Sequence, residues 1–277
     1  MNDENQFSLD DQELVSVLDE INLWSAPFAL KLLDTIKYRK NIVALDIGFG
    51  TGFPLIELAM RMGNTSAIYG IDPWEAAAKR ALFKIQAFGI SNITLISGKA
   101  ENMPFGTDYF DLIVSNNGIN NADDMQAVFA ECFRTMKPGA QFVFTVNLHF
   151  TMIEFYRIFA KALAVNGLNE ESAKMRQHIN SKRKSVAEIL KKLNSAGLTV
   201  NNIFHDCFRF RYSDGTSFLN HYFIKLAFMP EWKKIIPEGE RDFIFSLLES
   251  ELNSISDMYG SLSLSVPFAV FDCEKNI

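Results

Sequence analysis

Residues Val43 to Pro54, which read VALDIGFGTGFP, constrain the fold of this chain more than any other segment. An apolar run of strand length leads directly into three glycines at alternate positions, Gly48, Gly50 and Gly52. Glycines placed there permit a tight turn from a strand into a helix, and they let a ligand approach the backbone amides. The segment therefore predicts a strand–turn–helix unit of an α/β domain, with a ligand at the carboxyl end of the strand.

The same alternation continues along the first half of the chain. Apolar runs of strand length are separated by stretches of helical spacing. We expect strands at 42–47, 67–71, 93–96, 110–114 and 141–146, and helices at 54–62, 75–88 and 123–135. Strands and helices that alternate in this way form a parallel sheet with helices on both faces, so the sequence predicts a doubly wound, Rossmann-like α/β fold.

The alternation stops after residue 147. A helix is predicted at 185–196 and strands at 198–210 and 262–271, whereas the segments between them are helical and aromatic. At the other end, apolar residues at helical spacing over 13–37 predict two helices separated near Pro27. We therefore expect one domain over 1–277, made of a helical cap (1–38), a core (39–147), and insertions at 148–184 and 213–260.

Composition excludes several classes of protein. The 277 residues include 27 Lys+Arg and 33 Asp+Glu, a net charge of −6, which disfavours a nucleic-acid partner. Three scattered cysteines indicate neither a metal site nor a disulfide framework. The acidic, polar N-terminus is unlike a targeting signal, and no apolar run approaches the roughly 20 residues of a membrane span. We expect a reduced, cytoplasmic protein.

Two acidic side chains indicate which ligand the glycine turn would hold. Asp46 lies two residues before Gly48, and Asp72 ends the second predicted strand, 20 residues after Gly52. A carboxylate at Asp46 would repel the pyrophosphate of a dinucleotide but would attract an ammonium or sulfonium group. The third glycine also comes one residue too early for the dinucleotide pattern. An NAD(P)-dependent oxidoreductase is therefore the less favoured alternative.

Further motifs extend the glycine motif into a family pattern. Gly98-Lys-Ala-Glu-Asn-Met-Pro-Phe105 follows the third strand, Tyr109-Phe-Asp-Leu-Ile-Val-Ser-Asn-Asn117 contains the fourth, and Met136-Lys-Pro-Gly139 precedes the fifth. In this order and spacing the chain resembles the class I S-adenosylmethionine-dependent methyltransferases over residues 40–147. It is most similar to their small-molecule branch, which includes the ubiquinone and menaquinone methyltransferases. The resemblance implies a mostly parallel seven-stranded sheet with an antiparallel last strand.

The resemblance also implies a role for each matching position. S-adenosylmethionine is the implied cofactor, and no metal is implied. The residues that would bind the cofactor are Trp24, Asp46, Gly48, Phe49, Gly50, Gly52, Asp72, Pro73, Trp74, Ala100, Glu101, Ser115 and Asn116. Asp72 would bind the ribose hydroxyls, Pro73 and Trp74 would flank the adenine, and Ser115 and Asn116 would line the space towards the acceptor. The segment around Trp24 would close over the cofactor.

One position departs from the family pattern. The family commonly has an aspartate that accepts from the adenine amino group, where this chain has Lys99. An ammonium group has only donors, so either Glu101 takes this role or the contact is lost. The departure leaves a second alternative open, a methyltransferase-like protein that binds the cofactor without catalysis.

The methyl acceptor is constrained only by class. Methyl transfer from a sulfonium is an in-line displacement, which needs a base only if the acceptor must lose a proton. His149, after the fifth strand, and His221 are the candidate bases or acceptor contacts. Phenylalanines are concentrated in 150–159 and 204–245, which suits a partly apolar pocket that excludes water. We expect a small organic acceptor and, because aromatic insertions could pack a partner subunit, a possible homodimer.

Overall fold

The computed structural model describes residues 10–20 and 23–276. Ile21, one of the apolar positions behind the predicted first helix, and the polar N-terminal residues 1–9 lie outside this range. By its contacts the chain divides into two compact units. The first, called the core unit, comprises Met1–Asn147, Ser185–His205 and Phe268–Ile277. The second unit comprises Leu148–Lys184 and Asp206–Pro267.

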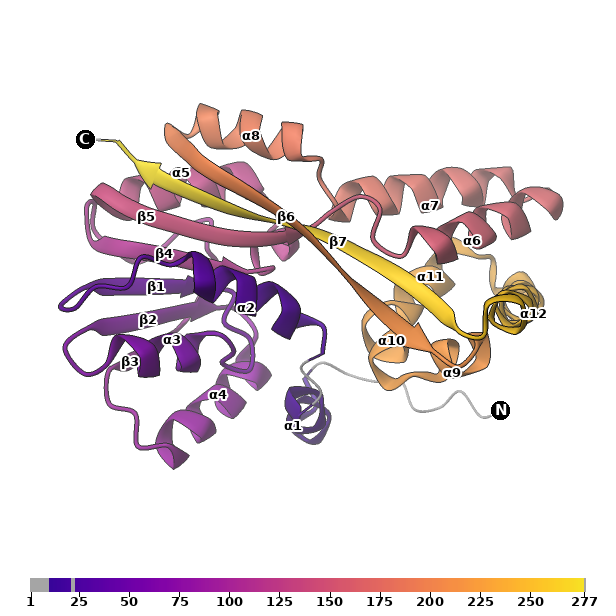
Figure 1. Ribbon diagram of the computed structural model, residues 1–277, viewed down its shortest axis with the longest axis horizontal. Helices are drawn as coiled ribbons and strands as arrows, with labels where there is room; N and C mark the ends of the chain where they lie inside the picture. The colour runs from indigo at the N-terminus through magenta and orange to yellow at the C-terminus, as the bar shows by residue number, and fades with distance from the viewer. Residues whose placement is uncertain (1–9, 21–22, 277) are drawn as a thin grey trace. The chain divides into compact units, whose positions relative to one another are not determined.

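One seven-stranded sheet has the order β3-β2-β1-β4-β5-β7-β6 (Figure 1), and the core unit contains β1 to β5 whole, β6 up to His205 and β7 from Phe268. The strands of the sheet are β1 (Val43–Ile47), β2 (Ala67–Asp72), β3 (Ile93–Ser97), β4 (Phe110–Asn116), β5 (Met136–Asn147), β6 (Leu198–Tyr212) and β7 (Leu262–Lys275). Strands β1 to β5 pair in parallel, and β7 pairs antiparallel with β5. The predicted doubly wound fold with an antiparallel last strand is confirmed.

Apolar side chains explain why these strands lie inside the unit. In β4 and β5 nearly every residue is buried, as expected for strands covered on both faces. β5 begins earlier than predicted, because Met136 already pairs with Phe110. The register then shifts before Leu112 pairs with Gln141, so the Lys137-Pro138-Gly139 turn forms an irregularity inside the strand.

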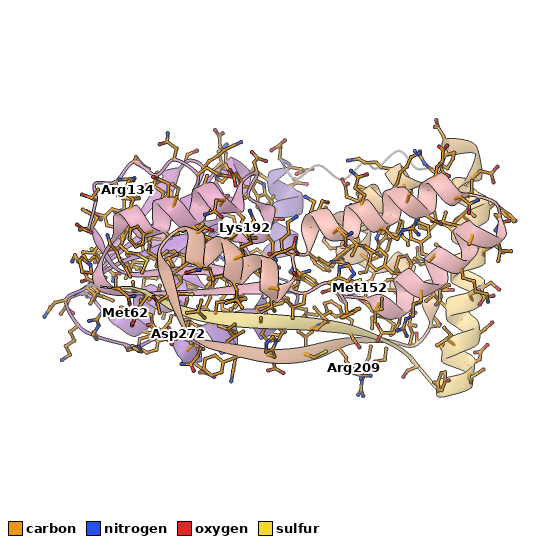
Figure 2. The ribbon with its side chains drawn as sticks, turned by 90° about the horizontal axis from the view of Figure 1, so that it is seen from above. Met62, Arg134, Met152, Lys192, Arg209 and Asp272 are labelled. Atoms are coloured by element: carbon orange, nitrogen blue, oxygen red, sulfur yellow. The ribbon has the colours of Figure 1, made fainter. Side chains whose placement is uncertain are left out.

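Helices cover the sheet of the core unit. They are α1 (Gln12–Glu20), α2 (Ser25–Thr35), α3 (Leu55–Met62), α4 (Glu75–Ala87), a 3₁₀ turn (Ile119–Asn121), α5 (Met125–Thr135) and α8 (Val186–Ser195). Pro27 lies in the first turn of α2 rather than between two helices, since proline is tolerated there. Helices α5 and α8, marked by Arg134 and Lys192 in Figure 2, lie side by side.

The second unit is mainly helical. Its helices are α6 (Ile153–Val165), α7 (Asn169–Lys182), α9 (Gly215–Asn220), α10 (Tyr222–Ala227), α11 (Met229–Ile235), a 3₁₀ turn (Glu238–Glu240) and α12 (Arg241–Tyr259). Met152, labelled in Figure 2, precedes α6 in a left-handed conformation with φ 55°. The first expected insertion, 148–184, has the bounds of this unit's first segment. The second segment runs over 206–267, so it includes the end of β6 and the beginning of β7 in addition to the expected insertion at 213–260.

An aromatic cluster forms the centre of the second unit. Trp232 is fully buried, stacks on Phe155 at 4.1 Å between ring centroids, and donates its indole N–H to the Tyr156 hydroxyl at 3.0 Å. Phe159 and Phe218 are also fully buried. These phenylalanines of the enriched segments therefore serve first as packing, which stabilises a unit of this size by several kcal/mol, at roughly 1.5–3 kcal/mol per buried ring.

Two further features of the described residues concern membranes and metals. None of their helices has the length and apolar character that crossing a bilayer demands. Likewise, they contain no group of three or more His, Cys, Asp or Glu side chains arranged to hold a metal ion.

Candidate functional site

A cavity of about 460 Å³ lies at the carboxyl ends of β1, β2 and β4 in the core unit. This is the edge at which open α/β sheets bind ligands, and the volume suits a small molecule or cofactor. Its walls come from Trp24, Ser25, Ile47, Gly48, Gly50, Ile71, Asp72, Pro73, Trp74, Gly98, Lys99, Ala100, Glu101, Asn116, Asn117, Gly118, Ile119, Asn121, Ala122 and Asp123.

The glycine turn forms one wall of the cavity because its backbone adopts conformations that other residues avoid. Gly48, Gly50 and Gly52 have φ values of 75°, 52° and 103°. A Cβ on Gly48 would lie 2.8 Å from the Cα of Gly118, whereas a Cβ on Gly50 would meet nothing within 4 Å. Position 48 therefore requires a glycine for two reasons, the close approach of its backbone to Gly118 and its positive φ angle.

Asp46 is the most unusual side chain beside the cavity. It is fully buried, and neither carboxylate oxygen has a hydrogen-bond partner. Burial, with the neighbouring charge of Asp72 as a second cause, raises the pKa of Asp46 well above its ordinary value. Contrary to expectation the carboxylate does not itself line the cavity, so it would act on a bound cation through its charge.

Asp72 lines the cavity and holds its two nearest loops. Its Oδ2 accepts from the backbone N–H of Gly50 at 2.8 Å, and its Oδ1 accepts from that of Trp74 at 2.8 Å. Burial raises the pKa of Asp72, and these two backbone donors oppose the rise. Each carboxylate oxygen has a second lone pair, so Asp72 can still accept hydrogen bonds from a ligand hydroxyl.

The loop after β3 forms the opposite wall. The Lys99 ammonium donates to Asp123 at 2.7 Å, and Glu101 Oε1 accepts from the backbone N–H groups of Asp123 and Asp124 at 2.8 and 3.3 Å. Lys99 thus pairs with an acid across the cavity rim. Both side chains of this pair are largely exposed, so it adds little stability.

Most of the predicted cofactor residues come together in this one cavity. Trp24, Gly48, Gly50, Asp72, Pro73, Trp74, Ala100, Glu101 and Asn116 all line it. Ser115 does not: it is fully buried and donates to the carbonyl of Ile47 at 2.8 Å, which corrects the expectation that it lines the space towards an acceptor. Phe49 is also buried, and its ring packs closely against the backbone of Gly70, where a Cβ would collide with it. A Cβ on Gly52 would collide with the side chain of Ile56, so Gly52 packs against that residue.

The two candidate histidines belong to the second unit. His149 is exposed and lies edge-on to the ring of Phe150. His221 packs against the ring of Tyr212, its Nδ1 has no hydrogen-bond partner, and burial lowers its pKa. Neither contributes to the cavity of the core unit, and their predicted roles stay predictions.

Sequence reasoning missed the segment that follows β4. Asn117, Gly118, Ile119, Asn121, Ala122 and Asp123 all line the cavity. The rule that ligands bind beyond the carboxyl ends of parallel strands would have included this segment, since β4 is the neighbour of β1. No motif marks it, because its asparagines and glycine are typical of any surface loop.

The acidic side chain of Asp19 links helix α1 to the site. Asp19 accepts from Arg80 Nε at 2.9 Å and from Lys84 Nζ at 2.6 Å, both on α4. Burial alone would raise the pKa of Asp19, but bonds from Lys84, from Thr51 of the glycine turn and from Arg80 hold it below its ordinary value. Asp19 therefore connects α1 to both the glycine turn and α4.

We expect Asp19→Asn to destabilise the protein by about 1–3 kcal/mol at pH 7, because hydrogen bonds to charged groups contribute that much. A lowered folded pKa stabilises the protein above the unfolded pKa, near 3.9, and this contribution is lost as pH falls through the folded pKa. Urea denaturation at pH 7 and pH 3 measures both effects. Glu13→Gln, on an exposed position of the same helix, is the control; an equal loss in both variants would contradict the assignment.

Comparison with known proteins identifies the family. The model of a family described as "Methyltransferase domain" matches residues 38–200, and because this is more than half of the chain, the protein belongs to that family. A demethylmenaquinone methyltransferase of Anoxybacillus flavithermus is 31% identical over 129 residues, which are 46% of this chain and 54% of that protein. The resemblance to class I S-adenosylmethionine-dependent methyltransferases is thereby confirmed, although the match spans only about half of that relative.

Solved structures agree with this fold. The YcgJ protein of Bacillus subtilis aligns with a TM-score of 0.60 at 18% identity, covering 91% of this chain and 99% of that one. A phosphoethanolamine N-methyltransferase 2 of Haemonchus contortus, solved with S-adenosyl-L-methionine, aligns with a TM-score of 0.58 at 17% identity, covering 99% of this chain and 59% of that one. At these identities the likeness shows a shared fold.

Proposed function

We propose that the core unit binds S-adenosylmethionine and that the protein transfers its methyl group to a small, partly apolar organic acceptor. The pair of acidic side chains carries this proposal. Asp72 lies on the cavity wall, and Asp46 is buried behind it with both oxygens unpartnered. A buried carboxylate without a partner is costly unless a positive charge compensates it, and this cofactor brings a sulfonium and an ammonium group. The residues present therefore fit the group.

The cavity offers a place for each part of that cofactor. Asp72 would accept from the ribose hydroxyls, and Pro73 and Trp74 would flank the adenine. The backbone of Gly48 and Gly50 would meet the methionine part, and Trp24 would cover it. All six residues line one cavity of about 460 Å³.

The dinucleotide alternative is less favoured by the same observations. A pyrophosphate would add negative charge next to Asp46 and Asp72, both of which already carry a raised pKa. The backbone N–H of Gly50, which a phosphate would need as a donor, is also occupied by Asp72. These facts support a cationic ligand over an anionic one.

The bound cofactor would supply an activated methyl group. The protein then needs mainly to position the acceptor next to that group and to exclude water. Holding donor and acceptor in line removes several kcal/mol from the barrier. Asp72 would bind and orient the cofactor, Asp46 would attract it through its charge, and the side chains of Trp24 and Ile119 would exclude water from the cavity. A base would be needed only for an acceptor that loses a proton, and His149 and His221 stay the candidates for that step.

We expect Asp72→Ala to weaken the binding of S-adenosylhomocysteine by about tenfold or more. The change removes the acceptor for the ribose hydroxyls and frees the N–H groups of Gly50 and Trp74. Titration calorimetry measures the affinity, and circular dichroism verifies the fold. Asp72→Asn, which keeps one acceptor oxygen, should bind with intermediate affinity. Equal affinity of wild type and Asp72→Ala would rule out the ribose assignment.

Catalysis is tested by turnover. Methyl-labelled S-adenosylmethionine, incubated with the protein and a metabolite extract, should yield a labelled small molecule. Cofactor binding without any labelled product would instead support the non-catalytic alternative, which Lys99 and the absence of both candidate bases from the cavity lining leave open. The same preparation can be tested for the proposed homodimer by sedimentation, and a cytoplasmic location is part of the proposal.

A further inference from the structure

The ion pair between Lys99 and Asp123 joins two loops at the cavity rim. Lys99 belongs to the loop after β3 and Asp123 to the loop after β4, and both residues line the cavity. Lys99 Nζ lies 2.7 Å from Asp123 Oδ2, and the two side chains are 64% and 77% exposed. An exposed pair of this kind hardly stabilises the fold, but it can still act on a bound ligand.

The backbone of Asp123 is held in place by its neighbours. Its N–H and that of Asp124 both donate to Glu101 Oε1, at 2.8 and 3.3 Å. The Asp124 side chain caps helix α5 by accepting from the backbone N–H of Gln126 at 2.8 Å. The Asp123 carboxylate therefore extends from a fixed point of the loop, and its bond to Lys99 sets its direction.

The order of the strands decides which part of the cofactor reaches this pair. In the proposed function, Gly48 and Gly50 after β1 meet the methionine part, and Asp72 at the end of β2 accepts from the ribose. The next strand in the sheet is β3, so the base, on the far side of the ribose, extends towards the loop after β3. Lys99 lies in that loop, and the ion pair brings the Asp123 carboxylate to the same place.

An adenine at this place needs an acceptor for its 6-amino group, which is a hydrogen-bond donor. The Lys99 ammonium has only donors. Glu101 Oε1 already accepts two backbone hydrogen bonds, and Asp72 is assigned to the ribose. A carboxylate has about four lone-pair sites, and Lys99 uses one of those of Asp123, so this side chain can accept from a further donor.

We propose that the Asp123 carboxylate accepts a hydrogen bond from the 6-amino group of the adenine and that Lys99 positions it. The acceptor that Lys99 cannot supply then comes from the opposite wall rather than from Glu101. Asp123 selects a 6-amino purine over a 6-oxo purine, because a carboxylate attracts the N–H groups of the first and repels the carbonyl oxygen of the second. This inference rests on the proposed function, since it concerns the same cofactor.

Two ligands that differ at the 6 position of the base test the proposal. S-inosylhomocysteine has a carbonyl oxygen where S-adenosylhomocysteine has the 6-amino group. Titration calorimetry gives both dissociation constants, and their ratio is the preference for adenine, which we expect to be about tenfold or more in the wild type. Asp123→Ala should lower this preference by about 3- to 10-fold, as the loss of one hydrogen bond allows. A role in the fold alone would weaken both ligands by the same factor.

Further variants separate the acceptor from the residue that positions it. Lys99→Met leaves the carboxylate but no longer holds it, so the preference should fall by less than in Asp123→Ala. Lys99→Arg keeps the ion pair and should keep the preference. Asp124→Asn is the matched control: it removes a charge from the same loop, its side chain does not line the cavity, and asparagine can still cap α5. Its preference should equal that of the wild type.

The possible results separate this inference from the proposed function. If the wild type fails to bind S-adenosylhomocysteine, the proposed function fails and this inference with it. If that ligand binds, three results would overturn the role of Asp123 alone. These are no preference over S-inosylhomocysteine in the wild type, an equal weakening of both ligands in Asp123→Ala, and a loss of preference in Asp124→Asn as large as in Asp123→Ala.

Discussion

Replacing Gly48 by alanine is expected to abolish cofactor binding and to destabilise the protein by about 2–4 kcal/mol. The new Cβ would lie 2.8 Å from the Cα of Gly118, in a residue whose φ of +75° already disfavours a side chain. Gly118 cannot easily withdraw, because it is itself confined: a Cβ there would lie 2.6 Å from the carbonyl oxygen of Ile47. Both the glycine turn and the loop after β4 must therefore shift, and these are two walls of the cavity.

Gly50→Ala is the matched control for this prediction. Gly50 also has a positive φ, +52°, but a Cβ there meets nothing within 4 Å. Gly50→Ala should therefore lower the free energy of unfolding only by the conformational strain, about 1–2 kcal/mol. Urea denaturation gives both free energies of unfolding, and calorimetry gives the affinity for S-adenosylhomocysteine. If the two variants were equally stable and bound equally well, the close approach of Gly48 and Gly118 would not matter for the site.

Asp46→Asn is expected to change stability and binding in opposite directions. In the free protein the substitution removes a buried carboxylate that has no hydrogen-bond partner, so the free energy of unfolding should rise at pH 7. In the complex it removes a charge that attracts the cationic cofactor, so affinity should fall by about tenfold or more. Replacing a residue that only supports the fold would lower both the free energy of unfolding and the affinity for the cofactor.

The pH dependence of this effect follows from the raised pKa of Asp46. Between the unfolded value, near 3.9, and the raised folded value, the native state binds more protons than the unfolded state, so stability falls as pH rises. The stability gained by Asp46→Asn should therefore grow from pH 4 upwards. Cofactor binding to wild type should release protons, because a nearby cation favours the charged carboxylate; calorimetry in buffers of different ionisation enthalpy measures this release.

Asp111→Asn serves as the contrasting control, because Asp111 is also an aspartate of the sheet but is paired. Its Oδ2 accepts from Lys137 at 2.8 Å and from the backbone N–H of Val43 at 2.9 Å. Its replacement should lower stability without affecting the cofactor. A loss of stability for Asp46→Asn of the same size as for Asp111→Asn would contradict the account of Asp46.

The sequence was sufficient for those features that depend on local spacing. The strands β1 to β5 and the glycine turn follow from apolar runs and from three alternating glycines, and the acids Asp46 and Asp72 follow from their positions at strand ends. What each side chain contacts depends on tertiary packing, so it could not be predicted. Ser115 is an example, because its hydroxyl bonds to β1 rather than to the cavity.

Features formed by distant segments were missed for the same reason. Lys99 and Asp123 pair only because the loops after β3 and β4 meet at the cavity rim, 24 residues apart along the chain. Asp19 bonds to Arg80 and Lys84 across more than 60 residues. The second unit also includes the end of β6 and the beginning of β7, because the boundary between the units depends on tertiary contacts rather than on where a strand begins or ends.

Titration calorimetry of the wild-type protein with S-adenosylmethionine, S-adenosylhomocysteine and NAD tests the central claim most directly. The two adenosyl ligands should bind at one site per chain, with an affinity that Asp46→Asn and Asp72→Ala both reduce, whereas NAD should give no heat of binding. Saturable binding of NAD together with no binding of either adenosyl ligand would contradict the proposed function.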